Sequence, residues 1–197
     1  KQEKNMKNKC IVIGGGAAGM MAALALADGT WQVELLEKNE KLGKKIYITG
    51  KGRCNVTNDC EADTFFANVV SNPKFLYSAY YTFDNTQMMQ FLEENGCPLK
   101  IERGNRVFPV SDHSSDIIRT LQNALLKKNV KISLHTEVKN LLIEDGRVCG
   151  VELSDGKKNP ADAVVVATGS VSYSSTGSTG DGYRFAEDCG HKITEVK

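Results

Sequence analysis

The clearest pattern of apolar and polar positions lies near the start of the chain. A short apolar run, Cys10 to Ile13, is followed by glycines and then by a segment rich in alanine, leucine and methionine. The run has the length of a buried strand, and the second segment has the length of a helix. We expect the helix to end at Asp28-Gly29, because glycine tolerates the left-handed conformation of helix ends. Val33 to Leu36 then predicts a second strand.

The middle of the chain changes character twice. Residues 38–59 combine basic residues with glycine, threonine and asparagine, which favours an ordered loop over a long helix. Residues 61–112 contain short segments rich in aromatic residues and methionine, which we attribute to core packing rather than to a substrate pocket. Within them, apolar residues at helical spacing predict a helix that stops at Gly96. These residues are Met88, Met89, Phe91 and Leu92.

An amphipathic helix is expected next, up to about Asn129. Ser114 or Ser115 can cap its start, and basic residues lie at its end. Its apolar positions form one stripe, which should face the core. The stripe consists of Ile117, Ile118, Leu121, Leu125 and Leu126. We assign no catalytic role to His113, which stands alone in the preceding loop.

The last third of the chain predicts mainly strands. Two pairs, Asp145-Gly146 and Asp155-Gly156, separate β-rich runs and predict hairpin turns in a small antiparallel meander. Ala163 to Ala167 is almost continuously apolar, which suits the centre of a parallel sheet. It ends at Thr168-Gly169, where glycine lets the backbone approach a ligand at the carboxyl edge of the sheet.

The final stretch leads through small residues to Gly180-Asp181-Gly182 and then to a short helix, Tyr183 to Asp188, which ends near Gly190. A flexible linker is one interpretation of the small residues. Their position directly after the apolar strand, and the abrupt change to a helix, favour an ordered loop beside a ligand.

Gly14, Gly16 and Gly19 have the G-x-G-x-x-G spacing of a dinucleotide-binding turn. The first glycine allows a sharp turn, the second leaves room for a pyrophosphate against the backbone, and the third allows the helix to pack closely on the strand. Unpaired N–H groups at the helix start would face the phosphates, assisted by the helix dipole. A glycine-rich turn in another α/β protein is the alternative, which the flanking strand and helix disfavour.

Glu37 lies 18 residues after Gly19, near the spacing of ~20 at which an acidic side chain accepts hydrogen bonds from a ribose. A carboxylate within about 4 Å of a 2′-phosphate would be repelled by several kcal/mol. The expected ligand therefore has a free ribose, as FAD and NAD do. The basic loop that follows is either a solvated loop or a cationic cradle for a pyrophosphate.

Length and charge bound the function only loosely. The 197 residues suffice for one domain with a sizeable core or for two small ones, and the formal net charge of +1 gives no reason to expect nucleic acid or a membrane as a partner. Residues 1–8 form a polar leader without a signal-peptide core, so a cytoplasmic protein is expected. Residues 1–5 are a candidate processed or added segment, because Met appears first at position 6.

The six cysteines are scattered, with no C-x-x-C pair and no zinc-like quartet, so we expect reduced thiols and no metal site. Cys54 and Cys60 invite comparison with the C-x-x-x-x-C pair of flavin-dependent disulfide reductases. Five residues separate them instead of four, which favours two unrelated thiols.

Five blocks of the sequence together resemble a bacterial flavoprotein family that includes aminoacetone oxidase and BaiN-type dehydro-bile-acid reductases. The resemblance extends from about Lys9 to the end of the chain. The blocks are IGGGAAGMMAA, VELLEKNEKLGKKIYITGKGRCNVTN, ERGNRVFPVSD, DAVVVATG and YSSTGSTGDGYRFAEDCGH. One departure is Ser174, where relatives commonly carry proline, so this loop is free to adopt a different conformation.

The resemblance implies that the chain binds FAD. The implied contacts lie in the glycine turn, at the end of the second strand, in the basic loop, at one backbone position near the adenine, at the end of the A-T-G strand and in the loop after it. They are Gly14, Gly16, Ala17, Ala18, Gly19, Glu37, Lys38, Lys44, Lys45, Gly50, Gly52, Arg53, Cys54, Asn55, Val138, Ala167, Thr168, Gly169, Gly180 and Asp181.

Relatives in this family continue past the position of Lys197 into an inserted substrate domain and then return to the FAD domain. We therefore expect residues 9–197 to be a truncated FAD-binding domain of the α/β class, Rossmann-like, with a parallel sheet, helices and a small antiparallel β-meander. Such a chain would shape the adenosine half of the site and enclose the flavin ring poorly.

The predicted function of the intact protein is hydride transfer between FAD and a small organic substrate or NAD(P)H. No residue is a convincing acid, base or nucleophile, so no catalytic residue is assigned. The alternatives are an NAD-dependent dehydrogenase, a flavoprotein of the fumarate-reductase or ketosteroid-dehydrogenase kind, and a non-catalytic dinucleotide-binding fragment. The sequence predicts neither the substrate nor the oligomeric state.

Overall fold

The computed structural model describes residues 8–195, so the expected polar leader lies outside the described residues except for Asn8. Contacts divide the chain into two compact units. The first combines the residues up to Lys45 with those from Gln122 onward, and the second is Ile46–Leu121. The expectation of a single domain over residues 9–197 stays a prediction, and each unit is described by itself.

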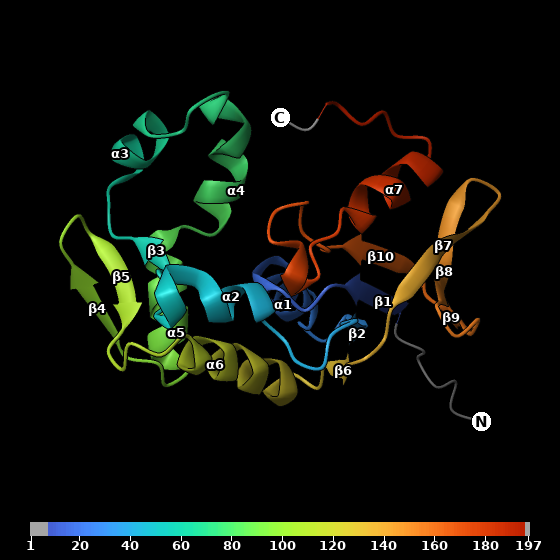
Figure 1. Ribbon diagram of the computed structural model, residues 1–197, viewed down its shortest axis with the longest axis horizontal. Coiled ribbons are helices and arrows are strands. Elements are labelled where there is room, and N and C mark those ends of the chain that lie inside the picture. The colour runs from blue at the N-terminus through green and yellow to red at the C-terminus, as the bar shows by residue number, and fades with distance from the viewer. Residues whose placement is uncertain (1–7, 196–197) are drawn as a thin grey trace. The chain divides into compact units, whose positions relative to one another are not determined.

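The first unit is built on a parallel sheet of four strands in the order β10-β1-β2-β6 (Figure 1). Its strands are β1 (Asn8–Ile13), β2 (Trp31–Leu36), β6 (Lys131–Ser133) and β10 (Ala163–Val166). Ile13 lies beside both Leu36 and Val166, so three strands end at the same edge. The predicted strand, helix and strand at the start of the chain are confirmed.

The prediction that Ala163 to Ala167 forms a central strand is wrong for this sheet. Among residues 8–195, β10 pairs only with β1 and is an edge strand, with Val166 40% exposed. Its apolar character has another cause. One of its faces contacts helix α1 (Ala17–Leu26) and the other contacts strand β8 (Arg147–Leu153) of the meander. A strand covered on both faces is apolar wherever it lies in a sheet.

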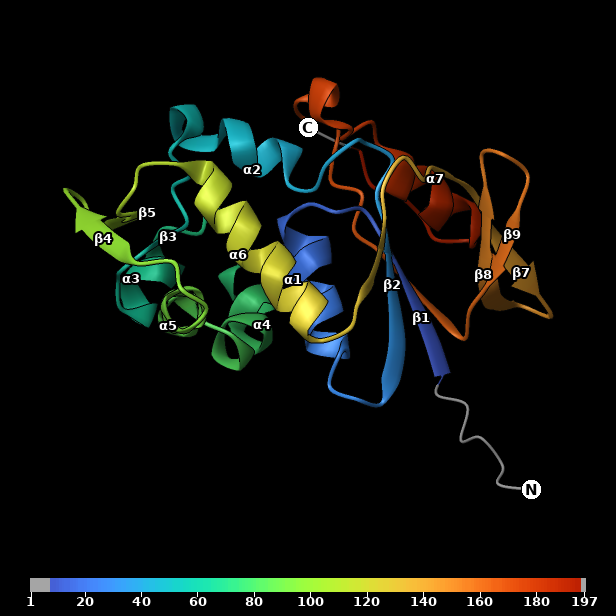
Figure 2. The same ribbon diagram turned by 90° about the horizontal axis from the view of Figure 1, so that it is seen from below.

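The two faces of the parallel sheet carry separate layers, as Figure 2 shows: α1 lies on one side and the meander on the other. Side chains alternate along β1, so Ile11 and Ile13 pack with Val151 and Phe185 on the meander side, and Cys10 and Val12 point to the opposite face. All of these side chains are buried.

The meander consists of β7 (Val138–Glu144), β8 and β9 (Lys158–Pro160), paired antiparallel. Asp145 and Gly146 both have positive φ, at 50° and 73°, which is the requirement of the tight hairpin turns that Asp-Gly favours. The predicted hairpins are confirmed. After β10 the chain forms a short 3-10 turn, η3 (Ser174–Thr176), and helix α7 (Asp181–Asp188), close to the predicted final helix.

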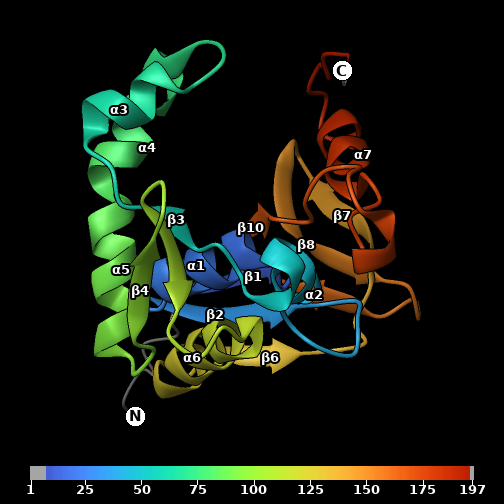
Figure 3. The same ribbon diagram turned by 60° about the vertical axis from the view of Figure 1, so that its left-hand side comes forward.

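The second unit contains a small antiparallel sheet in the order β3-β5-β4 and several short helices (Figure 3). The basic loop becomes α2 (Lys44–Ile48) and η1 (Thr49–Gly52), so no long helix forms there, as predicted. The remaining elements are β3 (Thr57–Asn58), α3 (Ala62–Ala67), η2 (Pro73–Leu76), α4 (Tyr77–Thr82), α5 (Asn85–Glu94), β4 (Leu99–Glu102), β5 (Arg106–Pro109) and α6 (Ser114–Lys127). The first two residues of α2 and the part of α6 from Gln122 on belong to the first unit. Helix α5 packs against β3 and β4.

The attribution of the aromatic residues of this unit to core packing is wrong for α3, η2 and α4, which bury no residue. Their rings contact one another instead: Phe65 stacks on Tyr80 at 4.6 Å, and Phe66 meets Tyr77 edge-on at 4.4 Å between ring centroids. These contacts leave the rings accessible to solvent: Tyr77 is still 42% exposed, and Phe75 of η2 is 79% exposed.

Two predictions about α6 also need correction. Ser114 and Ser115 lie inside the helix, and the Ser114 hydroxyl donates to the Tyr47 carbonyl at 2.9 Å instead of capping the helix. Leu126 is 54% exposed and lies off the buried stripe, which runs through Ile117, Leu121 and Leu125. By contrast, α5 ends as predicted, with Gly96 at φ 87°.

A buried carboxylate joins four parts of the first unit. Glu34 on β2 is only 4% exposed, and its oxygens lie 2.8 Å from the Lys9 ammonium and 2.7 Å from the Lys131 ammonium. Ser133 and Asn159 also donate to it, each at 3.1 Å. Burial acts to raise the pKa of Glu34, but the bonds from Lys131, Lys9 and Asn159 outweigh it and lower the pKa to about 2.

We predict that Glu34→Gln destabilises the fold by about 3 kcal/mol at neutral pH, because it leaves two ammonium groups beside a neutral amide. The folded-state pKa lies below the ordinary 4.5, so the stabilisation by Glu34 is complete above that pH. It is lost as the pH falls towards about 2. Urea unfolding at several pH values should show the difference between wild type and variant shrinking over this range. The matched change Glu187→Gln, at an exposed position, should alter neither the free energy of unfolding nor its dependence on pH.

Candidate functional site

A pocket opens at the carboxyl edge of the parallel sheet, where ligands bind in open α/β sheets. It is formed by the turn after β1, the end of β2, the start of the meander, the end of β10 and the loop before α7, all within the first unit. Its lining residues are Ile13, Gly14, Gly16, Leu36, Glu37, Lys38, Asn39, Thr136, Val138, Ala167, Thr168, Gly169, Thr176, Gly177, Asp181 and Phe185.

The three glycines of the G-x-G-x-x-G motif have different surroundings in the structure. Gly14 has φ 105°, and a Cβ there would lie 2.5 Å from the Ala167 carbonyl oxygen. A Cβ at Gly19 would lie 1.8 Å from the Gly14 carbonyl oxygen. Neither position accepts a side chain, so α1, β1 and β10 can approach closely. Gly16 differs, because a Cβ there would meet no atom within 4 Å and would project into open space.

Gly16 is also the N-cap of α1, and no side chain caps this helix. The first N–H groups of an α-helix have no partner within the helix, and they carry the positive end of its dipole. Ala17 and Ala18, which begin the helix, are exposed. Bare backbone and uncapped N–H groups therefore meet at the mouth of the pocket, an arrangement suited to an anion.

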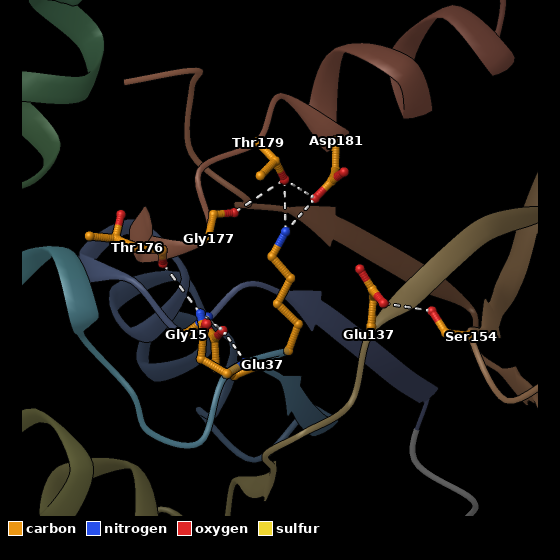
Figure 4. Close-up of polar contacts among 10 residues, drawn as sticks. Gly15, Glu37, Glu137, Ser154, Thr176, Gly177, Thr179 and Asp181 are labelled. Carbon is orange, nitrogen blue, oxygen red and sulfur yellow. Dashed lines mark hydrogen bonds and ion pairs between the residues drawn. The ribbon is translucent and has the colours of Figure 1, made fainter. Parts of the chain in front are cut away.

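Glu37 lies at the end of β2 and is 8% exposed. Its Oε2 accepts a hydrogen bond from the Gly15 N–H at 2.7 Å. Its Oε1 accepts two from Asn39, one from the backbone N–H at 2.8 Å and one from Nδ2 at 2.6 Å. The acidic residue predicted from its spacing thus lies in the pocket, fixed against the glycine turn (Figure 4).

Asn39 is a pocket residue that was not predicted from the sequence. Besides holding Glu37, its Nδ2 lies 3.3 Å from the Thr176 carbonyl oxygen in the loop before α7. Gly177 packs directly on it, because a Cβ at Gly177 would lie 2.8 Å from Nδ2. The signal in the sequence was weak: an asparagine two residues after the acidic residue, at a turn.

Lys38 and Asp181 were both predicted to contact a cofactor, and the structure pairs them with each other. The Lys38 ammonium lies 2.9 Å from Asp181 Oδ2 and 2.8 Å from Thr179 Oγ1, and Figure 4 shows Thr179 and Asp181 side by side above Glu37. Burial acts to raise the pKa of Asp181, but Lys38 and Thr179 outweigh it, so the pKa is lowered. The ion pair fastens the loop before α7 to the end of β2.

The end of β10 contributes a polar atom that has no protein partner. Thr168 Oγ1 is buried and makes no hydrogen bond within residues 8–195, although Thr168 lines the pocket. A buried hydroxyl without a partner costs about 1–3 kcal/mol. Such an orphan is expected where a ligand supplies the missing bond. Gly169 follows with φ 80°, and a Cβ there would lie 2.8 Å from Ser178 Oγ.

The remaining predicted residues of the first unit lie around this pocket in different ways. Val138 lines it, at the start of β7. Lys44 lies 3.4 Å from Asn39 Oδ1 and 3.3 Å from Glu40, and Lys45 donates to the Ser172 carbonyl at 2.8 Å. Gly180 is the left-handed N-cap of α7 and does not line the pocket.

Five predicted residues, Gly50, Gly52, Arg53, Cys54 and Asn55, belong to the second unit. The Arg53 guanidinium binds Glu102 and Asp112, and it lies 4.2 Å from the centre of the Phe108 ring. Its charge is therefore already offset by acidic side chains of the same unit.

The Cys54 side chain is buried, and burial, with a smaller effect of Cys97, raises its pKa to about 11. It is a free thiol, as are the other five cysteines, and a thiol with so high a pKa is a weak nucleophile. The FAD contacts expected for the second unit stay a prediction.

The pocket contains groups that can bind a polar ligand. It combines N–H donors at a helix start, a buried acceptor at Glu37 and a hydroxyl at Thr168. Its charged side chains, Glu37, Lys38 and Asp181, are all engaged with protein groups. Within residues 8–195, no group of three or more His, Cys, Asp or Glu side chains could hold a metal ion, and no helix is both long and apolar enough to cross a bilayer.

Comparison with known proteins agrees with this geometry. A family model, HI0933-like protein Rossmann domain, matches residues 8–196. A 3-dehydro-bile acid delta(4,6)-reductase of Clostridium scindens is 35% identical over 96% of this chain and 46% of the relative. A ribosomal RNA dihydrouridine synthase of Haemophilus influenzae is 30% identical over 91% of this chain and 45% of the relative. The chain thus spans about half the length of these relatives.

A solved structure shows the same fold. Sdh1 of Mycobacterium smegmatis, in complex with UQ1, superimposes with a TM-score of 0.69 at 22% identity, over 93% of this chain and 38% of that one. The predicted fold class, a Rossmann-like α/β domain, is confirmed, as is the predicted family resemblance.

The two helix-start glycines should respond differently to alanine. Gly19→Ala should destabilise the first unit by about 2–4 kcal/mol, because the new Cβ meets backbone that cannot move away. Gly16→Ala should cost less than about 1 kcal/mol, since its Cβ enters open space at a helix N-cap. Urea unfolding followed by circular dichroism measures both. Equal losses in the two variants would contradict the assigned geometry.

Removing the ion pair should loosen the loop before α7. We expect Lys38→Met to raise amide hydrogen exchange in residues 172–181 by about 3- to 10-fold, the effect of losing a partly exposed ion pair and its hydrogen bond. Exchange in β1 and α1 should not change. Lys192→Met, at an exposed position, is the matched control, and equal effects of both variants would contradict the role given to Lys38.

Proposed function

Because this chain belongs to the HI0933-like Rossmann domain family, we propose that it is the FAD-binding part of an oxidoreductase. One observation carries the proposal: open space at Gly16, beside the uncapped start of α1, faces a pocket that also contains the buried carboxylate of Glu37. Bare backbone for a phosphate and an acceptor for a ribose are the two requirements of an adenine dinucleotide.

The residues of the pocket fit the adenosine diphosphate half of FAD. Gly16 and the N–H groups of Ala17 and Ala18 would hold the pyrophosphate, and Glu37 would accept a hydrogen bond from the ribose. The Val138 backbone would lie at the adenine, as the family resemblance implies. Thr168 supports this fit, because its buried hydroxyl has no other partner among the described residues.

When bound, FAD supplies the redox chemistry by accepting or donating hydride. The part of the protein in residues 8–195 binds and orients it. No pocket side chain is placed as an acid or base, since the three charged groups are engaged in protein contacts. We therefore assign no catalytic residue.

The substrate class and the electron donor are further parts of the proposal. The Clostridium scindens relative is by name a reductase of a bile acid derivative, which supports a small organic substrate. We propose NADH or NADPH as the electron donor and the cytoplasm as the location. The Haemophilus influenzae relative acts by name on ribosomal RNA, but a formal net charge of +1 does not favour a nucleic acid substrate.

An NAD-dependent dehydrogenase and a non-catalytic dinucleotide-binding fragment are the competing functions. Mass spectrometry of the cofactor released by heat from the intact protein separates the first from a flavoprotein, since it would detect nicotinamide dinucleotide instead of FAD. Assays of flavin reduction by NADH and NADPH separate binding from turnover.

We predict that the 197-residue chain binds ADP and FAD with similar affinity, because only the adenosine half of the site is formed by the residues of this pocket. Gly16→Val should weaken both at least about 10-fold, since its side chain would occupy the space proposed for the pyrophosphate. Isothermal titration calorimetry measures the affinities.

Ser115→Val is a matched control, because it also introduces valine near the start of a helix, at an exposed position of the second unit. Thermal unfolding should first show that each variant is folded. Failure of the wild-type chain to bind either ligand would contradict the proposed function. Tight, stoichiometric FAD with weak ADP would contradict the division into a formed adenosine half and an unformed flavin half.

A further inference from the structure

We infer that Asn39 is a positioning residue, which orients the Glu37 carboxylate for one hydrogen bond with the ribose of the ligand. The inference rests on the proposed function, because it assigns a partner to Glu37. It goes beyond that function by proposing that Asn39, which contacts the Glu37 carboxylate, determines how well this carboxylate recognises the ribose.

The hydrogen bonds of Glu37 leave room for one more donor. A carboxylate has about four acceptor positions, two on each oxygen. Both positions on Oε1 are taken by Asn39, through its backbone N–H at 2.8 Å and Nδ2 at 2.6 Å. Oε2 accepts from the Gly15 N–H at 2.7 Å. One position on Oε2 is left, and it belongs to a carboxylate that lines the pocket.

The Asn39 amide can point in only one direction. Glu37 can only accept hydrogen bonds, so the amide nitrogen must face it. The Lys44 ammonium can only donate, and it lies 3.4 Å from Asn39 Oδ1 on the other side of the amide. Both neighbours select the same orientation. Aspartate or an apolar residue at this position could not satisfy Glu37 and Lys44 together.

The second hydrogen of Nδ2 connects the ribose site to the loop before α7. It points to the Thr176 carbonyl oxygen at 3.3 Å. The next residue, Gly177, leaves only enough space for this contact, since a Cβ would lie 2.8 Å from Nδ2. The same amide thus fixes the carboxylate and supports the loop that borders the pocket.

Two roles of Asn39 must be separated. If it only supports the loop, replacing it lowers stability or weakens all ligands equally. If it positions Glu37, replacing it removes the contribution of one ribose hydroxyl and leaves the rest of the ligand bound. Comparing ligands that differ by that hydroxyl isolates the second effect, because losses common to both ligands cancel.

The experiment measures the affinities of ADP, 2′-deoxy-ADP and 3′-deoxy-ADP for the 197-residue chain by calorimetry. In the wild type, loss of the hydroxyl bound to Glu37 should weaken binding about 5- to 20-fold, as expected for a hydrogen bond to a charged group. In Asn39→Ala, removal of the same hydroxyl should weaken binding less than about 2-fold. Glu37→Gln should also reduce this effect of the hydroxyl, and the double variant, with both substitutions, should reduce it no further.

Asn68→Ala is the matched control, because the Asn68 side chain donates to the Thr64 carbonyl on the surface of the second unit. It should leave the preference for the hydroxyl unchanged. Thermal unfolding checks each variant, and Asn39→Ser replaces Asn39→Ala if the alanine variant is not folded. The serine hydroxyl is too short to hold Oε1 in the same way, so the preference should again fall.

The outcomes are distinct. A wild-type preference that survives in both Asn39 variants overturns the inference and leaves the proposed function intact. Equal weakening of all three ligands by Asn39→Ala also overturns it, in favour of a purely structural role. Absence of ADP binding by the wild type overturns the proposed function and, with it, the inference. Selective loss of the hydroxyl contribution in Asn39→Ala but not in Asn68→Ala supports it.

Discussion

The close approach of backbone at the carboxyl edge of the parallel sheet is the constraint on which the rest of the first unit depends. Gly19 brings α1 within contact of the Gly14 carbonyl, and Gly14 in turn touches the end of β10 at Ala167. With side chains at these positions, helix and strands would separate. Because they meet, the start of α1 points into the pocket and Gly16 remains open beside it. Gly14 and Ala167, which set this packing, therefore also line the proposed binding site.

Much of this arrangement could be predicted, because it depends on local signals. The strand, turn and helix at the start of the chain, the Asp-Gly hairpins and the helix after Gly180 each follow from residues close together in sequence. Glu37 could be placed in the pocket from its spacing alone. The prediction for Glu37 holds because parallel strands that end at one edge of a sheet bring the turns that follow them together.

What could not be predicted depends on partners far apart in sequence. The pairing of Lys38 with Asp181 spans 143 residues, and neither residue reveals its partner. The edge position of β10 was missed because coverage of both faces, not a central position, explains its apolar residues. The aromatic residues of α3 and α4 were assigned to a core because composition does not show whether rings meet other elements or only each other.

The charges of the pocket indicate how a dinucleotide would be recognised there. Its lining contains two carboxylates, Glu37 and Asp181, and one ammonium, Lys38, which is paired with Asp181. Ion pairs from these side chains therefore cannot account for attraction to a pyrophosphate. Within the lining of this pocket, the groups left to attract it are neutral N–H groups and the dipole at the start of α1, which act over a short range and require close contact. Close contact is what the bare backbone at Gly16 permits. A ligand with a further phosphate on its ribose would meet the Glu37 carboxylate at the opposite end of this arrangement, so the same geometry that attracts one anionic group excludes a second.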